Sequence, residues 1–194
     1  MPNLSGRLAS IIVAACLLTG CQPPAPTPSP LPSYRCTPEA GGAEFDCSPK
    51  QYDDMVAKEK LYAEAEAVYR KFLAEDARIL RAGGVSEPTP VLIETTSGDY
   101  LANVLANYRT IQQRGVTAKG PDPGLVFFRR APGRSKTGSD VSATTCVDGT
   151  SLMFSREGKT LGPGKVARDD TYFARVGGAM KIIGADGSQV ASCD

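Results

Sequence analysis

Residues 50–82 contain neither proline nor glycine, and this uninterrupted stretch constrains the fold more than any other feature of the chain. Its apolar side chains recur every three or four positions, the period of an amphipathic helix. Ser48 is suited to cap this helix, Pro49 to occupy its first turn and Gln51 to complete a capping box, whereas Gly83-Gly84 ends it. The pattern therefore predicts one helix of about nine turns at ~3.6 residues per turn. The apolar stripe along one face of this helix consists of Met55, Tyr62, Ala65, Tyr69, Phe72 and Ile79, and is widened by Leu61, Val68 and Leu73.

Two shorter helices and a series of strands are predicted after the long helix. Residues 91–95 fit a brief helix, and a third helix begins near Ser97 and ends at Gly115. The period then becomes that of strands, with hairpin turns expected at Asp148-Gly149, Glu157-Gly158 and Gly177-Gly178. Helices followed by an antiparallel meander predict an α+β domain whose curved sheet wraps the long helix. The predicted strands are residues 116–118, 124–130, 140–147, 151–155, 165–176 and 179–184, with a last run at 189–193.

The order of these elements over residues 48–193 resembles the NTF2-like cone, also called SnoaL-like or ketosteroid-isomerase-like. The resemblance rests on element order, helix lengths and strand count, without a diagnostic motif. It implies a long N-terminal helix and two shorter helices packed in a curved antiparallel sheet. A cystatin-like arrangement of helix on sheet is the alternative.

The N-terminus has the features of an export signal. Residues 8–18 are apolar except for Ser10, and this run is shorter than the roughly 20 residues of a membrane-spanning helix. The motif Leu18-Thr19-Gly20-Cys21 that follows resembles the bacterial lipobox. The resemblance implies cleavage before Cys21, a diacylglycerol on its thiol, and a protein anchored to the extracytoplasmic face of the cell membrane. A plain secretory signal, with Cys21 as an ordinary thiol, is the alternative.

A proline-rich segment follows the lipidation motif. Residues 22–32 contain six prolines in eleven positions and no charge, a composition typical of an extended spacer. A ligand for a proline-binding module is the other interpretation. The chain is thus divided into a signal peptide (1–20), a lipidated tether (21–35) and one α+β domain (36–194).

Four cysteines remain once Cys16 leaves with the signal and Cys21 is lipidated. An even number in an exported chain predicts disulfide bonds. Of the three possible pairings, Cys36 with Cys47 and Cys146 with Cys193 fits best, because the first pair flanks a short loop and the second pair lies on strand-like segments. We expect no metal site, since these cysteines lack CxxC spacing.

The composition excludes several classes of function. The chain has no histidine, which rules out a Ser/His/Asp or Cys/His mechanism within it. Removing Arg7 with the signal leaves 21 basic residues against 21 acidic ones, so a nucleic-acid partner is not expected. No motif indicates a cofactor, and Gly120-Pro121-Asp122-Pro123-Gly124 is a turn rather than a phosphate loop.

Candidate catalytic residues follow from the resemblance, which implies a tyrosine or protonated carboxyl as oxyanion donor and a second carboxylate as base. Asp76 is the leading candidate, because it lies seven residues after Tyr69 and fourteen after Tyr62 on the apolar stripe. If buried there, it would need Arg109 or a tyrosine hydroxyl as partner, and its pKa would be raised. The simpler interpretation places Asp76 at a solvated edge, because the stripe drifts around the helix by ~20° per heptad. Further candidates are Asp99, Tyr100, Asp169 and Asp170.

The remaining features favour structural interpretations. Tyrosines at helical spacing are usually core residues, and Asp169-Asp170 is most simply a bulge or an exposed strand edge. Arg129, Arg130, Arg134 and Lys136 surround a loop that either contacts an anionic surface or is a solvated hairpin tip.

The leading functional hypothesis is a non-enzymatic, membrane-anchored lipoprotein that binds a hydrophobic small molecule or a protein partner at the cell envelope. The second is a cofactor-free isomerase, dehydratase or hydrolase that uses Asp76 with a tyrosine. The third is a prophage-type lipoprotein that blocks infection. A pocket with Asp76 inside it favours the enzyme over a partner-binding surface.

Overall fold

The computed structural model of the chain describes residues 33–194. Within this range three helices are formed: α1 (Pro49–Ala82), α2 (Pro90–Thr95) and α3 (Gly98–Gln113). A short hairpin of β1 (Tyr34–Cys36) and β2 (Phe45–Cys47) precedes α1. The signal peptide, Cys21 and the proline-rich segment to Pro32 lie outside the described residues. Among residues 33–194, no helix has both the length and the apolar character needed to cross a membrane.

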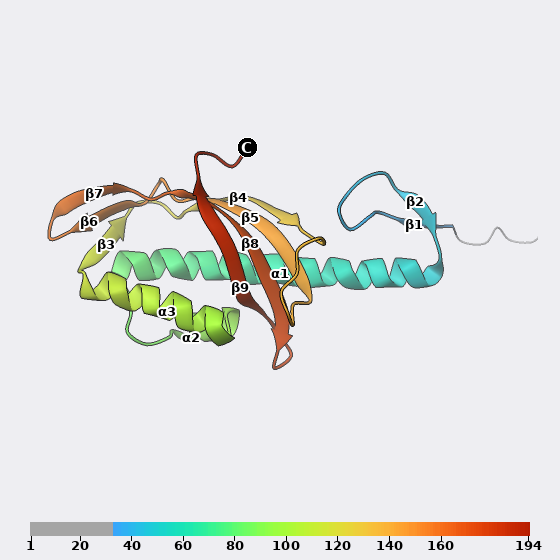
Figure 1. Cartoon of the computed structure of the whole chain (residues 1–194), viewed down its shortest axis with the longest axis horizontal. Helices are drawn as coiled ribbons and strands as arrows, with labels where there is room; N and C mark the ends of the chain where they lie inside the picture. The colour runs from blue at the N-terminus through green and yellow to red at the C-terminus, as the bar shows by residue number, and fades with distance from the viewer. Residues whose placement is uncertain (1–32) are drawn as a thin grey trace, which may run out of the picture. The chain divides into compact units, whose positions relative to one another are not determined.

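The strands after α3 form two antiparallel sheets (Figure 1). The smaller sheet has the order β3-β6-β7, and the larger has the order β4-β5-β8-β9 with β4 and β9 at its edges. The predicted α+β class, with helices first and an antiparallel sheet after them, is confirmed. The strands are β3 (Val116–Lys119), β4 (Gly124–Arg130), β5 (Val141–Asp148), β6 (Met153–Arg156), β7 (Lys159–Pro163), β8 (Val166–Val176) and β9 (Ala179–Val190).

The ends of α1 are set by local chemistry, as predicted. Gln51 N donates to Ser48 Oγ at 3.3 Å, and Ser48 N donates to Gln51 Oε1 at 2.8 Å, which completes the capping box. At the other end Gly83 adopts a left-handed conformation with φ of 84° and satisfies the last carbonyls of the helix.

Gly84 determines how closely α3 approaches the end of α1. Its φ is 90°, and a Cβ atom there would overlap the carbonyl oxygen of Tyr108 and lie 2.7 Å from the backbone nitrogen of Gln112. Glycine alone lacks the atom that would force the two helices apart. The contact holds Tyr108 against the C-terminal half of α1.

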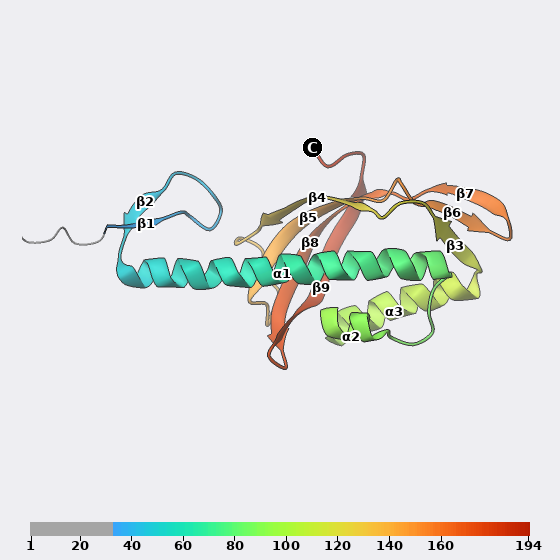
Figure 2. The same ribbon diagram turned by 180° about the vertical axis from the view of Figure 1, so that it is seen from behind.

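The core lies between α1 and the inner face of the larger sheet, which the helix crosses, with α2 and α3 beside its C-terminal half (Figure 2). The strand predicted at residues 140–147 forms as β5, along which Val141, Ala143 and Thr145 face α1, whereas Cys146 faces away and bonds to Cys193. Side chains from every layer fill this core, among them Tyr62, Tyr69, Phe72, Ile79, Leu92, Tyr108, Phe173 and Ile182.

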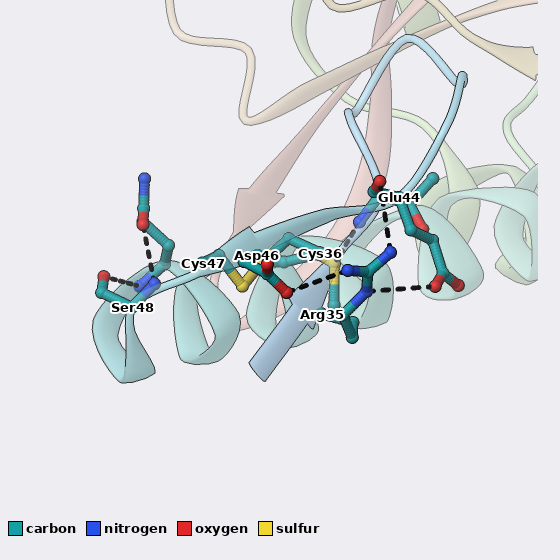
Figure 3. The surroundings of a disulfide bond; sticks show 9 residues. Arg35, Cys36, Glu44, Asp46, Cys47 and Ser48 are labelled. Carbon is teal, nitrogen blue, oxygen red and sulfur yellow. Dashed lines mark hydrogen bonds and ion pairs between the residues drawn. A yellow bond between two sulfur atoms is a disulfide. The ribbon is translucent and has the colours of Figure 1, made fainter. Parts of the chain in front are cut away.

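Within residues 33–194, two disulfide bonds form, in the pairing favoured by the sequence. Cys146 in β5 is joined to Cys193 beyond the end of β9. Cys36 is joined to Cys47, which closes the β1-β2 hairpin immediately before the cap of α1 (Figure 3). Arg35 pairs across this hairpin with Asp46 at 2.9 Å and with Glu44 at 3.7 Å. Tyr34 and Arg35, which the sequence assigns to the tether, therefore belong to a strand.

The strand predictions were wrong in three respects. β7 was missed, because its glycine and proline residues are typical of turns. β9 continues to Val190 instead of ending at Gly184, and residues 189–193 are not a separate strand. Asp148-Gly149 does not form a hairpin turn, because β5 and β6 belong to different sheets.

Candidate functional site

A cavity of about 350 Å³ lies between α1, α3 and the two sheets. Most of its wall is apolar or aromatic, and a few polar groups are placed among these side chains. Helix α1 contributes Tyr69, Phe72, Leu73, Asp76 and Leu80, and α3 contributes Tyr100, Val104, Asn107 and Tyr108. The strands and their connections contribute Val147, Leu152, Phe154, Lys165, Ala167, Asp169, Thr171 and Ala185, with Pro123, Gly149 and Gly164.

Asp76 lines this cavity and does not lie at a solvated edge, so the simpler sequence interpretation was wrong. Its Oδ1 accepts a hydrogen bond of 2.6 Å from the hydroxyl of Tyr108. The partner is a tyrosine and not Arg109, whose guanidinium donates to the carbonyl of Ser86 and pairs with Glu87 at 3.8 Å. Burial raises the pKa of Asp76, and the hydrogen bond from Tyr108 offsets part of that rise.

Asp169 is the second carboxyl of the cavity. In β8 it pairs with Thr145 of β5 and with Gly187 of β9, so its side chain shares the inner face of the sheet with that of Thr145. A Cβ at position 187 would overlap the Asp169 carboxylate, so glycine leaves the space that this group occupies. Burial, and then the neighbouring charge of Asp170, raise the pKa of Asp169.

The Asp169 carboxylate has no partner within residues 33–194. Its backbone carbonyl accepts from Thr145 Oγ1 at 3.4 Å, but no hydrogen bond or ion pair reaches its side-chain oxygens. Since this strand is internal to the sheet, the interpretation of Asp169-Asp170 as a bulge or an exposed edge was wrong. Asp170 points to the other face, where it accepts from Thr144 at 2.7 Å and pairs with Arg134 at 3.2 Å.

Two tyrosine hydroxyls supply further polar groups. Tyr69 is only 4% exposed, and its oxygen accepts from Thr145 Oγ1 at 3.0 Å, which leaves the phenolic proton available to another acceptor. Tyr100 has no hydrogen bond from its hydroxyl to any of residues 33–194, and its ring packs on Phe72. Burial raises the pKa of both phenols, and the charges of Asp76 and Asp169 raise it further. Both hydroxyls are therefore donors at physiological pH.

The other residues singled out in the sequence lie outside this cavity. Tyr62 is a core residue, as expected, and its hydroxyl donates to Glu39 at 2.6 Å near the β1-β2 hairpin. Asp99 is exposed in the first turn of α3. Of the three leading candidates, the fold thus brings Asp76 and Tyr69 to one cavity and places Tyr62 elsewhere.

The basic residues near 129–136 each contact a different acidic or aromatic side chain and do not form a single anion site. Arg130 binds Glu59 with two hydrogen bonds and lies over the ring of Tyr62. Arg129 stacks on Phe127 at 4.1 Å, and Lys136 lies 5.8 Å from the ring of Tyr172. Three of these four cations therefore lie beside aromatic rings, which the sequence did not suggest.

The sequence did not identify Tyr108 as a functional residue, because its spacing along α3 indicates only a position on the apolar face of that helix. The inward orientation of Asp169 could have been predicted from the sequence, because residues 169, 171 and 173 alternate along one strand and therefore share a face with the apolar Phe173. Within the residues that the structure describes, no three Cys, Asp or Glu side chains are grouped to bind a metal ion.

No protein-family model and no curated protein sequence matches the chain. One similar solved structure is the intermembrane space region of the chloroplast protein ARC6, which is 19% identical, with 66% of this chain and 95% of that chain covered and a TM-score of 0.40. A second is a de novo designed β-sheet protein, 15% identical, with 72% of this chain and 92% of that chain covered and a TM-score of 0.29. These TM-scores are too low to support a shared fold.

Proposed function

We propose that this protein is a lipid-anchored, extracytoplasmic binding protein whose cavity holds a small, largely apolar molecule. The cavity is the observation that carries the proposal: about 350 Å³ of space bounded by aromatic and aliphatic side chains, with the carboxyls of Asp76 and Asp169 and several tyrosine hydroxyls among them. Its volume lies in the range of small-molecule sites, and such sites combine an apolar wall with a few polar groups that orient the ligand.

An NTF2-like cone is the fold that we propose for this domain. A long capped first helix, two shorter helices and a four-stranded antiparallel sheet whose inner face packs on α1 support it. The cavity between the helices and the sheet agrees with a cone that is open at one end. The part that α3 plays in the cavity wall, through Tyr100 and Tyr108, supports the cone over the cystatin-like alternative of one helix on a sheet.

Binding can be tested with the neutral apolar fluorophore N-phenyl-1-naphthylamine, whose emission rises in an apolar site. We expect the parent protein to bind it and the cavity-filling variant Ala167→Leu to lose at least tenfold in affinity. Ala179→Leu, an identical change at an exposed position of β9, is the matched control and should bind as the parent does. Ala185→Leu fills the cavity from another strand. Unchanged binding by both filling variants, each folded by circular dichroism, would exclude the cavity.

The anchor is tested separately, by the partitioning of the full chain in a detergent phase. The lipobox resemblance predicts that Cys21→Ser moves the protein from the membrane and detergent fractions to the aqueous fraction. Two acyl chains or their equivalent are needed for stable anchoring, so loss of the diacylglycerol should release the protein completely. Continued detergent partitioning of the variant would contradict the lipid anchor.

Proton-transfer catalysis without a cofactor is a second candidate function. It is favoured by the placement of Asp169 and Asp76 in one cavity with the hydroxyl donors Tyr69 and Tyr100. One carboxylate would remove a proton next to a carbonyl, and a tyrosine hydroxyl would stabilise the oxyanion. Exchange of the α-protons of a cyclic ketone in D₂O measures this activity, which Asp169→Asn should abolish and Asp170→Asn should retain.

A further inference from the structure

The charged groups on the cavity wall are mostly acidic. The titratable groups on its wall are Asp76, Asp169, three tyrosine hydroxyls and Lys165. Lys165 is an exposed residue, and within residues 33–194 it forms no ion pair with either aspartate. Both carboxyls therefore lie among aromatic and aliphatic side chains without a cationic partner from the described part of the chain.

We propose that the ligand of this cavity is an organic cation, namely a protonated amine carried on an apolar body. This inference rests on the proposed binding function and specifies its ligand class. The ammonium group would lie against Asp169, and the apolar body would occupy the space between α1, α3 and the sheet.

Asp169 is the better-placed of the two carboxyls for an incoming cation. Asp76 already accepts the short hydrogen bond from Tyr108, whereas the side-chain oxygens of Asp169 have no donor among residues 33–194. The absent side chain at Gly187 leaves the space in which the Asp169 carboxylate lies against β9. Tyr69 is 4% exposed, and since its oxygen accepts the bond from Thr145, its phenolic proton can be donated to the ligand or to the same carboxylate.

Electrostatics favour a cation over a neutral or anionic ligand of the same shape. A carboxylate partly removed from water without a counter-charge is destabilised, and a bound ammonium group compensates that cost. The rings of Tyr69, Phe72 and Tyr100 add cation–π attraction for a cation within about 6 Å of a ring centre. A ligand carboxylate would instead be repelled by both aspartates.

The proton balance of binding supplies an independent readout. Burial raises the pKa of Asp169 in the empty cavity, and a bound ammonium group would lower it again. Amine binding should therefore release protons from the protein and weaken as the pH falls through the range in which Asp169 becomes protonated.

Calorimetry with cyclohexylmethylamine, cyclohexylmethanol and cyclohexanecarboxylate tests the inference, because these probes share a ring and differ in charge. We expect the amine to bind at least tenfold more tightly than the alcohol, and the carboxylate not to bind. Asp169→Asn should reduce amine affinity to the level of the alcohol. Asp170→Asn removes the adjacent carboxyl on the opposite face of β8 and should change amine affinity by less than twofold.

The outcomes separate this inference from the proposed function. Equal affinities for amine and alcohol, or full amine binding by Asp169→Asn, would overturn the cation inference and leave the binding function intact. The same holds if the protein binds N-phenyl-1-naphthylamine but not the amine. Failure to bind either the fluorophore or any of the three ring probes would overturn the proposed function itself.

Discussion

The hydroxyl of Tyr108 in α3 donates a hydrogen bond of 2.6 Å to Oδ1 of Asp76 in α1. This contact joins two helices at a carboxyl that would otherwise lie in the cavity without a donor. We expect Tyr108→Phe to lower the free energy of unfolding by about 1–3 kcal/mol, the usual cost of leaving a buried polar group unsatisfied. Urea denaturation measures it. When Asp76→Asn is already present, Tyr108→Phe should lower the free energy of unfolding by less than it does in the parent protein. If the effects of the two substitutions simply add, the two groups are not coupled.

The raised pKa values of the two cavity aspartates predict a pH dependence of stability. Between the ordinary aspartate value of 3.8 and the raised folded value, the folded state holds protons that the unfolded state has released. The contribution of each group to stability therefore falls as the pH rises through that window. Compared with the parent, Asp169→Asn should become relatively more stable on going from pH 3.5 to pH 7. Thermal unfolding across this range checks the prediction, with Asp170→Asn as control.

Gly187 should tolerate no side chain. Because a Cβ there overlaps the Asp169 carboxylate, Gly187→Ala must displace that side chain or the strand, at a cost of about 1–3 kcal/mol. Gly124→Ala is the matched control, since its Cβ would meet nothing within 4 Å. Equal stabilities of the two variants in urea would show that the carboxylate does not occupy the space above Gly187.

The two disulfides should differ in their contribution to stability. The Cys146–Cys193 bond closes a loop with a sequence separation of 47, against 11 for Cys36–Cys47. On the loop-entropy model, replacing both cysteines by serine should cost about 4 kcal/mol for the longer loop and about 3 kcal/mol for the shorter one. Chemical denaturation of the two double-serine variants compares them, and a larger loss from the hairpin bond would contradict this order.

Local signals in the sequence account for what could be predicted. The limits of α1 follow from Ser48, Gln51 and Gly83, each of which acts on its own turn of helix. The length of β9 could not be predicted in this way, because Gly184 and Gly187 are typical of turns. In the fold, both make room for side chains from elsewhere, Lys136 and Asp169.

The position of Asp76 depends on tertiary contacts that spacing along one helix does not contain. Its stripe could have drifted toward solvent, but α3 covers it, and α3 can do so because Gly84 admits the backbone of Tyr108. The cavity likewise requires the pairing of β5, β8 and β9, which brings Thr145, Asp169 and Gly187 side by side. Such long-range pairing is absent from the local periodicity that predicts strands.

The disulfide that closes the β1-β2 hairpin has a mechanical consequence. A pull on the chain before Ser33 would pass from Cys36 through the two sulfur atoms to Cys47 and then directly into the capped end of α1. Residues 37–46 would carry none of this force. Reduction would add these residues to the connection and lengthen it by roughly 30 Å at about 3.3–3.6 Å per residue. The redox state of one hairpin thus sets the length of the connection between the chain before Ser33 and the start of α1.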